Sequence, residues 1–310
     1  MKQKTKNSKI VWYVLAAMAV LLAAPNGTVV KSVLETVDPV WFNVMRFSII
    51  ACVMLPALVV GLRKVTKRNL QYALLSGIFY AISVTGYTTA ISLSQASYVA
   101  IINLGIPILL MLFSVYLTKE RVSRRSFIGI TVAALGASTV IALPVAISGQ
   151  AGPGISLTAT ALAVMNSIAF PLMVIYSRKA SQTGLSLWFT LGIAAIVVAA
   201  ASLCVAVAVG VPAPSAEVLS RSSVIGSVLF SAIAVSLLAR LITIVTYQRI
   251  GSAATAGFQY TEVFLAILIP MMVLGERLTA EMAVGGTLIL VGLLIAEINH
   301  TPRTRESSLT

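Results

Sequence analysis

The chain has 310 residues, of which 58% are hydrophobic and only 10% are charged, and its mean hydropathy is +0.98. This composition excludes an ordinary water-soluble domain and is typical of an integral membrane protein. The net charge of +13 does not indicate a nucleic-acid-binding surface, because the basic residues are scattered in short clusters between apolar stretches.

Ten apolar stretches are each about long enough, at roughly 20 residues, to cross a bilayer as a helix. In chain order they cover residues 10–30, 40–61, 70–92, 97–117, 126–147, 156–177, 186–210, 222–247, 253–274 and 280–298. Little sequence remains between them for a soluble catalytic domain. A Pro- and Gly-rich segment at 148–156 predicts the boundary between two halves, residues 1–150 and 151–310.

Basic residues are distributed asymmetrically around these stretches. If the N-terminus is cytoplasmic, seventeen of the 22 basic residues fall in cytoplasmic segments, and only Lys31, Arg221 and Arg277 fall outside. This is the positive-inside bias of a multi-pass protein. We therefore expect both termini in the cytoplasm and a location in a bacterial-type inner membrane. The remaining two basic residues, Arg46 and Arg240, lie inside predicted spans.

One motif occurs twice, 156 positions apart. Each copy is a Glu-Arg pair, at 120–121 and 276–277, followed at the same spacing by Gly-x-Thr and a second glycine: Gly129, Thr131 and Gly136; Gly285, Thr287 and Gly292. The segment around the first pair is basic and that around the second is acidic, so equivalent segments face opposite sides of the membrane. We therefore predict an all-α integral membrane protein of ten transmembrane helices, built as two inverted five-helix repeats. Glycines seven residues apart also predict a smooth helix face for close packing.

These features resemble the EamA type of the drug/metabolite transporter superfamily. The resemblance is carried by the doubled motif, by the short turns at 93–97 and 249–253, and by Arg46-Phe47 early in the second span. It implies a secondary transporter of small metabolites, with export as the commoner direction. Two positions depart from the family pattern: Lys119 stands where glycine is usual, and Val263 replaces a common proline.

Residues with catalytic or ligating chemistry are few. His300 lies beyond the last stretch, and Cys52 and Cys204 sit in apolar stretches of different halves. We interpret the cysteines as buried small hydrophobes. Because no P-loop, H-E-x-x-H or G-x-S-x-G motif is present, we expect no enzyme activity, no metal and no cofactor.

Polar residues inside apolar spans are the best indicators of a binding site, because they are costly unless they face the bundle interior or a cavity. The third span carries a one-sided stripe, Ser76, Tyr80, Ser83 and Tyr87, and the eighth carries Ser236, Arg240, Thr243 and Tyr247. The alternative interpretation is ordinary interhelical hydrogen bonding. A stripe that recurs in both halves and contains an arginine favours a lined cavity.

Helix breaks accompany these polar positions. Pro25-Asn26-Gly27 is expected to interrupt the first span, Pro107 the fourth, and Asn166 with Pro171 the sixth. Such breaks are tolerated in a membrane where they line a cavity, and they indicate a transport path. The ninth span adds Gln259 and Glu262 on one face, and Asn103 is the equivalent of Gln259 in the fourth.

The candidate substrate site combines these positions. Its residues are Asn26, Tyr80, Ser83, Tyr87, Asn103, Asn166, Arg240, Thr243, Gln259 and Glu262, with Glu262 as the candidate for proton or ion coupling. Arg240 and Glu262 lie at similar depth on adjacent helices, and we expect them to interact directly or through water. Arg46 has two interpretations: an anchor that reaches outward to Asp38 and Glu35, or a contact to substrate.

The expected function is ATP-independent transport of a small metabolite, such as an amino acid or a related amphipathic solute, by alternating access. The expected partners are this solute and the lipid bilayer, with no nucleic acid. Proton or ion coupling and the oligomeric state are left open by the sequence. Two alternatives remain: a multidrug or toxic-cation exporter that couples to protons, and a non-transporting membrane protein such as a lipid scramblase.

Overall fold

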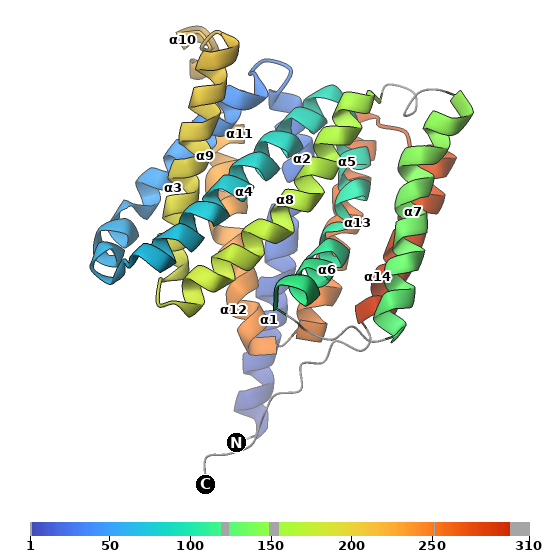
Figure 1. Cartoon of the computed structure of the whole chain (residues 1–310), viewed down its shortest axis with the longest axis horizontal. Coiled ribbons are helices and arrows are strands. Elements are labelled where there is room, and N and C mark those ends of the chain that lie inside the picture. The colour runs from blue at the N-terminus through green and yellow to red at the C-terminus, as the bar shows by residue number, and fades with distance from the viewer. Residues whose placement is uncertain (1, 119–123, 149–154, 251, 298–310) are drawn as a thin grey trace.

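The computed structural model describes residues 2–118, 124–148, 155–250 and 252–297, and within these ranges it contains helices and turns but no strand. The elements are α1 (Lys2–Ala23), α2 (Asn26–Val33), α3 (Pro39–Gly61), η1 (Leu62–Lys64), α4 (Lys67–Leu93), α5 (Ala96–Asn103), α6 (Ile106–Thr118), α7 (Arg124–Ser148), α8 (Leu157–Gln182), α9 (Leu187–Val209), α10 (Ala216–Ser220), α11 (Ser222–Leu229), η2 (Phe230–Ala239), α12 (Arg240–Ile250), α13 (Ser252–Leu274) and α14 (Ala280–Glu297). Helices lie at every predicted stretch (Figure 1), so the all-α prediction is confirmed.

Seven helical segments of the described chain are long and apolar enough to cross a membrane: Ile10–Val33, Pro39–Lys64, Lys67–Leu93, Phe127–Pro144, Leu157–Gln182, Leu187–Val209 and Ser222–Thr243. Three further apolar segments are shorter: Ala96–Leu110, Thr261–Leu274 and Ala280–Ile295. The molecule is therefore a multi-pass membrane protein. Seven of the ten predicted spans therefore correspond to helices long enough to cross a membrane in the described chain, and the count of ten transmembrane helices stays a prediction.

Several helices are capped at their N-termini by residues with short polar side chains. The Asp38 side chain accepts a hydrogen bond from the Val40 backbone at the start of α3, and Thr66 and Asn69 form a reciprocal capping box at the start of α4. Ser186 caps α9 in the same way. Each cap satisfies a backbone N–H that the first helical turn leaves without a partner. At the other end of α9, Gly210 adopts a left-handed conformation that ends the helix.

Two of the three predicted helix breaks are present. The first stretch divides at Pro25, between α1 and α2, and the fourth divides at Leu104–Gly105, just before Pro107. The third prediction is wrong, because α8 runs without interruption through Asn166 and Pro171. A proline removes one hydrogen bond from a helix, and a membrane helix packed among neighbours tolerates this loss.

The eighth stretch contains a helical element that the sequence pattern does not predict. Between α11 and α12 the chain forms a ten-residue π-helix, η2, with i→i+5 geometry. The Ser236 hydroxyl donates to the Ser231 carbonyl, five residues earlier, at 2.8 Å. Such wide helical turns are uncommon and are frequently found at functional sites.

Every major helix pair joins a helix of residues 1–150 to a helix of residues 151–310. α3 packs on α9, α4 on α8, α5 on α13, α7 on α14, and α1 on η2 and α12. In Figure 1 the α7–α14 pair stands at one edge of the bundle and the α3–α9 pair at the other. Between them, an apolar core that includes Phe47, Tyr80, Val198 and Leu237 brings α3, α4, α9 and η2 together.

The α7–α14 pair is held at close range by the glycines of the repeated motif. A Cβ atom on Gly136 would lie 2.6 Å from the Gly285 carbonyl oxygen, and one on Gly292 would lie 2.5 Å from the Gly129 carbonyl oxygen. The two helices therefore run antiparallel with their backbones in contact. The predicted smooth face for close packing is confirmed.

Candidate functional site

Polar side chains from different helices meet in the centre of the bundle, where they form two groups. The first, which we call the amide cluster, consists of Ser83 on α4, Asn103 at the end of α5, and Asn166 and Ser167 on α8. Ser83 donates to Asn166 Oδ1 at 2.6 Å, Asn166 Nδ2 donates to Asn103 Oδ1 at 2.7 Å, and Ser167 donates to the same Asn103 oxygen at 3.1 Å. Asn103 is the last residue of α5, directly before the break between α5 and α6. Three of the predicted site residues are thus hydrogen-bonded to one another.

The second group, the arginine cluster, consists of Arg46 on α3, Tyr80 on α4, Ser236 on η2 and Arg240 on α12. Arg46 donates through Nε and Nη2 to the Ser236 hydroxyl at 3.2 and 2.8 Å. The Arg240 guanidinium lies 5.7 Å from the centre of the Tyr80 ring, with a long contact of 3.5 Å from Nη1 to the Tyr80 hydroxyl. Both guanidinium groups therefore approach the face of α4 that carries Tyr80.

Asn26 links the break in the first span to the π-helix. Ser231 donates to Asn26 Oδ1 at 3.1 Å. The Tyr87 hydroxyl lies beside the Asn26 side chain and would be 3.4 Å from a Cβ atom on Gly27. Tyr87 also lies within electrostatic range of both Arg46 and Glu262. The start of α2 therefore faces the α4 stripe and η2 together.

The predicted α4 stripe is confirmed as an interior face. Ser76 donates to the Met173 carbonyl on α8 at 3.1 Å, one turn before the residues described above. Together with Tyr80, Ser83 and Tyr87, it turns toward α8, η2 and α12 rather than toward lipid. The hydrogen bonds of both clusters connect the first half of the chain to the second. This half-to-half boundary is where transporters of duplicated design bind their solutes.

Other predicted residues lie outside these networks. Thr243 donates to the Ala239 carbonyl of its own helix at 2.8 Å. The Gln259 side chain lies outside the described residues. The expected direct Arg240–Glu262 ion pair is not formed: within the described ranges the only ion pair joins Arg221 to Glu217, at 3.1 Å. Arg240 instead turns toward the Tyr80 ring and the Met173 sulfur, which lie on α4 and α8.

Arg46 does not act as an anchor reaching outward. Its side chain is only 5% exposed and is directed to η2, while Asp38 caps the start of its own helix. The anchoring interpretation is therefore wrong, because the chain turn at Asp38 uses that carboxylate locally. Sequence reasoning placed Ser236 on the polar stripe of the eighth span but not in the candidate site, and it missed Ser231 altogether. Their spacing of five residues was the available signal, since only a π-helical turn places such positions together.

A third polar contact closes one end of the bundle, where α4 turns into α5 at Ser94–Gln95. Lys31 on α2 donates to the carbonyls of Ile91 and Ser94 at the end of α4, at 2.8 and 2.7 Å. Glu276, between α13 and α14, accepts from the Ala96 and Ser97 backbone amides that begin α5, at 2.7 and 2.8 Å. Each charge is opposite in sign to the partial charge of the helix end that it binds. We call this arrangement the corner latch.

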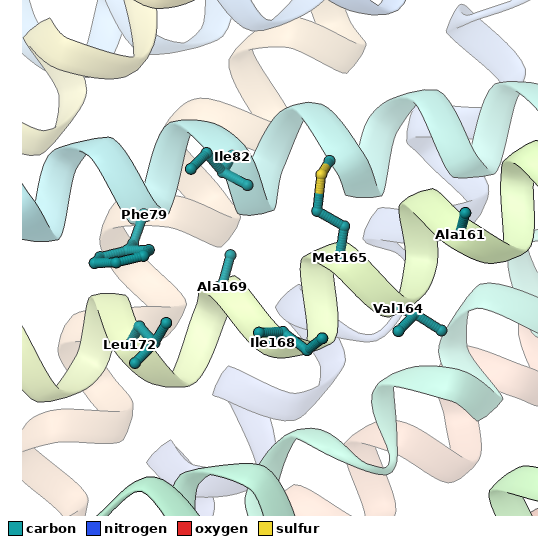
Figure 2. A pocket seen from close by; sticks show the side chains of 8 residues that line it. All are labelled: Phe79, Ile82, Ala161, Val164, Met165, Ile168, Ala169 and Leu172. Atoms are coloured by element: carbon teal, nitrogen blue, oxygen red, sulfur yellow. The ribbon is translucent and has the colours of Figure 1, made fainter. Parts of the chain in front are cut away.

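An apolar groove of about 330 Å³ lies between α4 and α8. Its lining residues are Phe79, Ile82, Ala161, Val164, Met165, Ile168, Ala169 and Leu172. Figure 2 shows Met165 and Ala169 directed from α8 toward α4. Ile82 and Ile168 are 38% and 41% exposed, so the groove opens on the outer surface of the bundle rather than on the polar clusters.

The chemistry available in the clusters is recognition rather than bond cleavage. The clusters provide amide, hydroxyl and guanidinium groups, which bind polar parts of a solute. Cys52 and Cys204 are both exposed on the helix surfaces, which corrects their interpretation as buried residues. On a membrane-embedded bundle, an exposed cysteine faces lipid and does not contribute to an interior site.

Part of the chain matches a known family, and its fold is similar to that of a solved structure. Residues 10–142 match the model of the EamA-like transporter family. No curated protein matches the chain. A solved structure described as "Crystal structure of protein" is 19% identical with a TM-score of 0.60, and the match covers 96% of this chain and 99% of that one. At this identity the likeness concerns the fold alone, and it extends over both halves.

Proposed function

Because residues 10–142 match the model of the EamA-like transporter family, we propose that this chain is a transporter of that type, a secondary transporter that moves a small metabolite across the cytoplasmic membrane without ATP. The observation that carries the proposal is the pair of polar clusters, whose hydrogen bonds join the two halves in the middle of an apolar bundle. The solute is an amino acid or a related amphipathic compound, and the direction is export. The coarser function, membrane transport of the drug/metabolite transporter type, follows from the family.

The two halves, residues 1–150 and 151–310, are inverted repeats in this proposal. A shift of 156 positions turns the Gly136–Gly285 contact into the Gly292–Gly129 contact. The two helices are antiparallel, and a two-fold axis that exchanges antiparallel helices lies perpendicular to them, in the plane of the membrane. The α5–α13 pair is self-equivalent under the same shift, and α4–α8 becomes η2 and α12 against α1; α3 and α9 correspond by their order in the two halves. These reciprocal contacts support the inverted arrangement.

Alternating access follows from two halves that can rock around the polar clusters. With both termini in the cytoplasm, Lys31 and Arg277 lie on the outside, so the corner latch closes the outer end. The latch joins Glu276 of the second half to the α4–α5 turn of the first. An outward-open state requires these hydrogen bonds to break, and the described arrangement corresponds to a state closed to the outside.

Glu262 is the coupling candidate because it lies inside a span, near Tyr87, without an ion-pair partner in the part of the chain that the structure describes. An unpaired carboxylate at this depth is costly when charged. It therefore gains most by taking up a proton or by binding a cationic group of the solute. In either case, Glu262→Gln should reach the membrane in normal amount and lose coupled transport.

The rival functions are less well supported. A toxic-cation exporter would place a cationic solute beside Arg46 and Arg240, where like charges repel. A lipid scramblase needs a polar path that is open to lipid, and the groove between α4 and α8 is lined by apolar side chains only. Both rivals predict outcomes that differ from metabolite exchange.

The decisive experiment is counterflow in proteoliposomes that contain the purified full chain. Liposomes loaded with one member of a panel of amino acids, organic acids or organic cations should take up that labelled solute faster than protein-free liposomes. Asn166→Ala, which opens the amide cluster, should reduce uptake. Uptake of no panel member, together with accelerated flipping of labelled lipid, would replace the transporter proposal with scrambling.

A further inference from the structure

Arg46 is a buried charge without a carboxylate partner. Its side chain is 5% exposed, and its guanidinium contacts the Ser236 hydroxyl and the face of the Phe47 ring, whose centre is 5.4 Å away. No Asp or Glu of the described ranges lies within ion-pair distance. A buried guanidinium in an apolar bundle is normally paired, because removal of its hydration shell costs several kcal/mol.

The sequence offers almost nothing that could neutralise this charge. Among the nine acidic residues, only Glu262 lies away from the ends of the predicted spans. Instead, the second guanidinium, that of Arg240, lies within electrostatic range of Arg46. Two like charges near Tyr80 raise the local positive potential and leave it unbalanced. Such an arrangement lacks the counter-ion that it would need as a purely structural element.

Arg46 uses the two nitrogens on one edge of its guanidinium, which we call the Arg46 fork, for hydrogen bonds to a single oxygen. Nε and Nη2 form the edge of a guanidinium that binds the two oxygens of a carboxylate. Here both nitrogens converge on one neutral oxygen, Ser236 Oγ, which in turn donates to the Ser231 carbonyl in the π-helix. A hydroxyl bonded in this way supplies lone pairs but no charge. The Ser236 hydroxyl oxygen occupies a position at which an anionic oxygen would bind the Arg46 guanidinium more strongly.

We propose that Arg46 and Arg240 together hold the carboxylate of the transported solute, with Ser236 filling the Arg46 fork when the solute is absent. The surrounding Phe47, Tyr80 and Tyr87 side chains are apolar or aromatic, so the rest of the solute is a small apolar or aromatic body. The site therefore selects organic carboxylates, zwitterions included, over uncharged and purely cationic solutes. This inference rests on the proposed transport function and names its substrate class.

The test measures the thermal stability of the purified full chain with a panel of small aliphatic and aromatic carboxylates. Each carboxylate is paired with its primary amide and with the amine of the same carbon skeleton. We expect at least one carboxylate to stabilise the protein and its amide and amine to fail. Arg46→Gln should lower the affinity of the protein for that carboxylate about tenfold to hundredfold, as expected for the loss of a charge-assisted hydrogen bond. Arg46→Lys should recover only part of the affinity because it keeps the charge and loses the fork.

Arg221→Gln is the matched control, because Arg221 is 47% exposed in its side chain and lies outside both clusters. A second measurement needs no ligand. Arg46→Met removes an unpaired buried charge, so its unfolding midpoint should equal or exceed that of the unmodified protein. A lower midpoint would mean that the guanidinium is structural, and the proposal would be overturned. Amides or amines that bind as well as the carboxylates, or no stabilisation by any carboxylate, would overturn it too. Counterflow of another solute would still uphold the transport function, whereas exchange of no solute would remove that function itself.

Discussion

The α7–α14 pair and the polar centre of the bundle are held together in opposite ways. Between α7 and α14 the contact is backbone against backbone, through glycines at a fixed spacing. In the centre, the contact is made by long side chains that cross between helices, such as Arg46 to Ser236 over 190 positions of sequence. The first interface tolerates no added atom, whereas the second can exchange one hydrogen-bond partner for another. This difference suits a fixed frame around a site that must bind and release.

The largest expected effect comes from filling the glycine contact. In Gly136→Leu the new side chain would begin 2.6 Å from the Gly285 carbonyl and 2.7 Å from the Ile289 amide, so the helix backbones must separate. We expect a loss of about 3 kcal/mol or more, or a failure to accumulate in the membrane. Detergent-solubilised protein would be measured by size-exclusion chromatography and thermal unfolding.

The control for this substitution is Gly226→Ala, since a Cβ atom there would meet nothing within 4 Å. It should behave like the unmodified protein. Normal yield and stability of Gly136→Leu would show that the two helices are not a fixed frame.

The next largest effect is expected in the amide cluster. Asn166→Ala removes the bonds to Ser83 and Asn103, so that the buried Ser83 hydroxyl loses its partner and Asn103 Oδ1 keeps only the bond from Ser167. A loss of about 1–2 kcal/mol is expected, at the lower end if the reference state in the membrane finds other partners. Counterflow should fall more than stability does. Ser138→Ala, whose hydroxyl bonds only the Ala134 carbonyl of its own helix, should change neither quantity.

The corner latch should show a local rather than a global effect. Glu276→Gln replaces a carboxylate that accepts from the Ala96 and Ser97 amides by a neutral group with one acceptor oxygen. Hydrogen exchange at the start of α5 should become about tenfold to hundredfold faster, with little change elsewhere. Glu217→Gln, in the exposed ion pair with Arg221, provides the comparison. Unchanged exchange at Ala96 and Ser97 would show that the latch does not hold the turn.

The smallest effect is expected at Thr243. Its hydroxyl bonds the Ala239 carbonyl of its own helix and joins neither cluster in the described structure. Thr243→Val should therefore change unfolding by less than about 0.5 kcal/mol and leave counterflow intact. A large loss of transport at normal stability would place Thr243 in contact with the solute.

Prediction from the sequence succeeded where a local pattern is sufficient. The apolar stretches located the helices, the prolines at 25 and 107 located two breaks, and glycine spacing identified the α7–α14 contact. Arg240 and Glu262 were expected at similar depth, in contact directly or through water; the described side chains form no direct ion pair, and the water-mediated contact stays a prediction. Equal depth does not fix the rotation of each helix, and Arg240 turns toward Tyr80 and Met173 instead. The Gln259 side chain lies outside the described residues, so its place in the site stays a prediction.

The membrane class, the positions of the helices and the equivalence of the two glycine motifs follow from the amino-acid sequence alone, because hydrophobic length and residue spacing are properties of short segments. Which polar groups meet depends instead on how the helices pack against one another. Arg46 could have turned outward to Asp38, and the spacing of Ser231 and Ser236 becomes meaningful only in the π-helix that places them together. The reason is physical: partners for a buried polar group are chosen by the packing and rotation of helices far apart in sequence, and neither is encoded in any one of them.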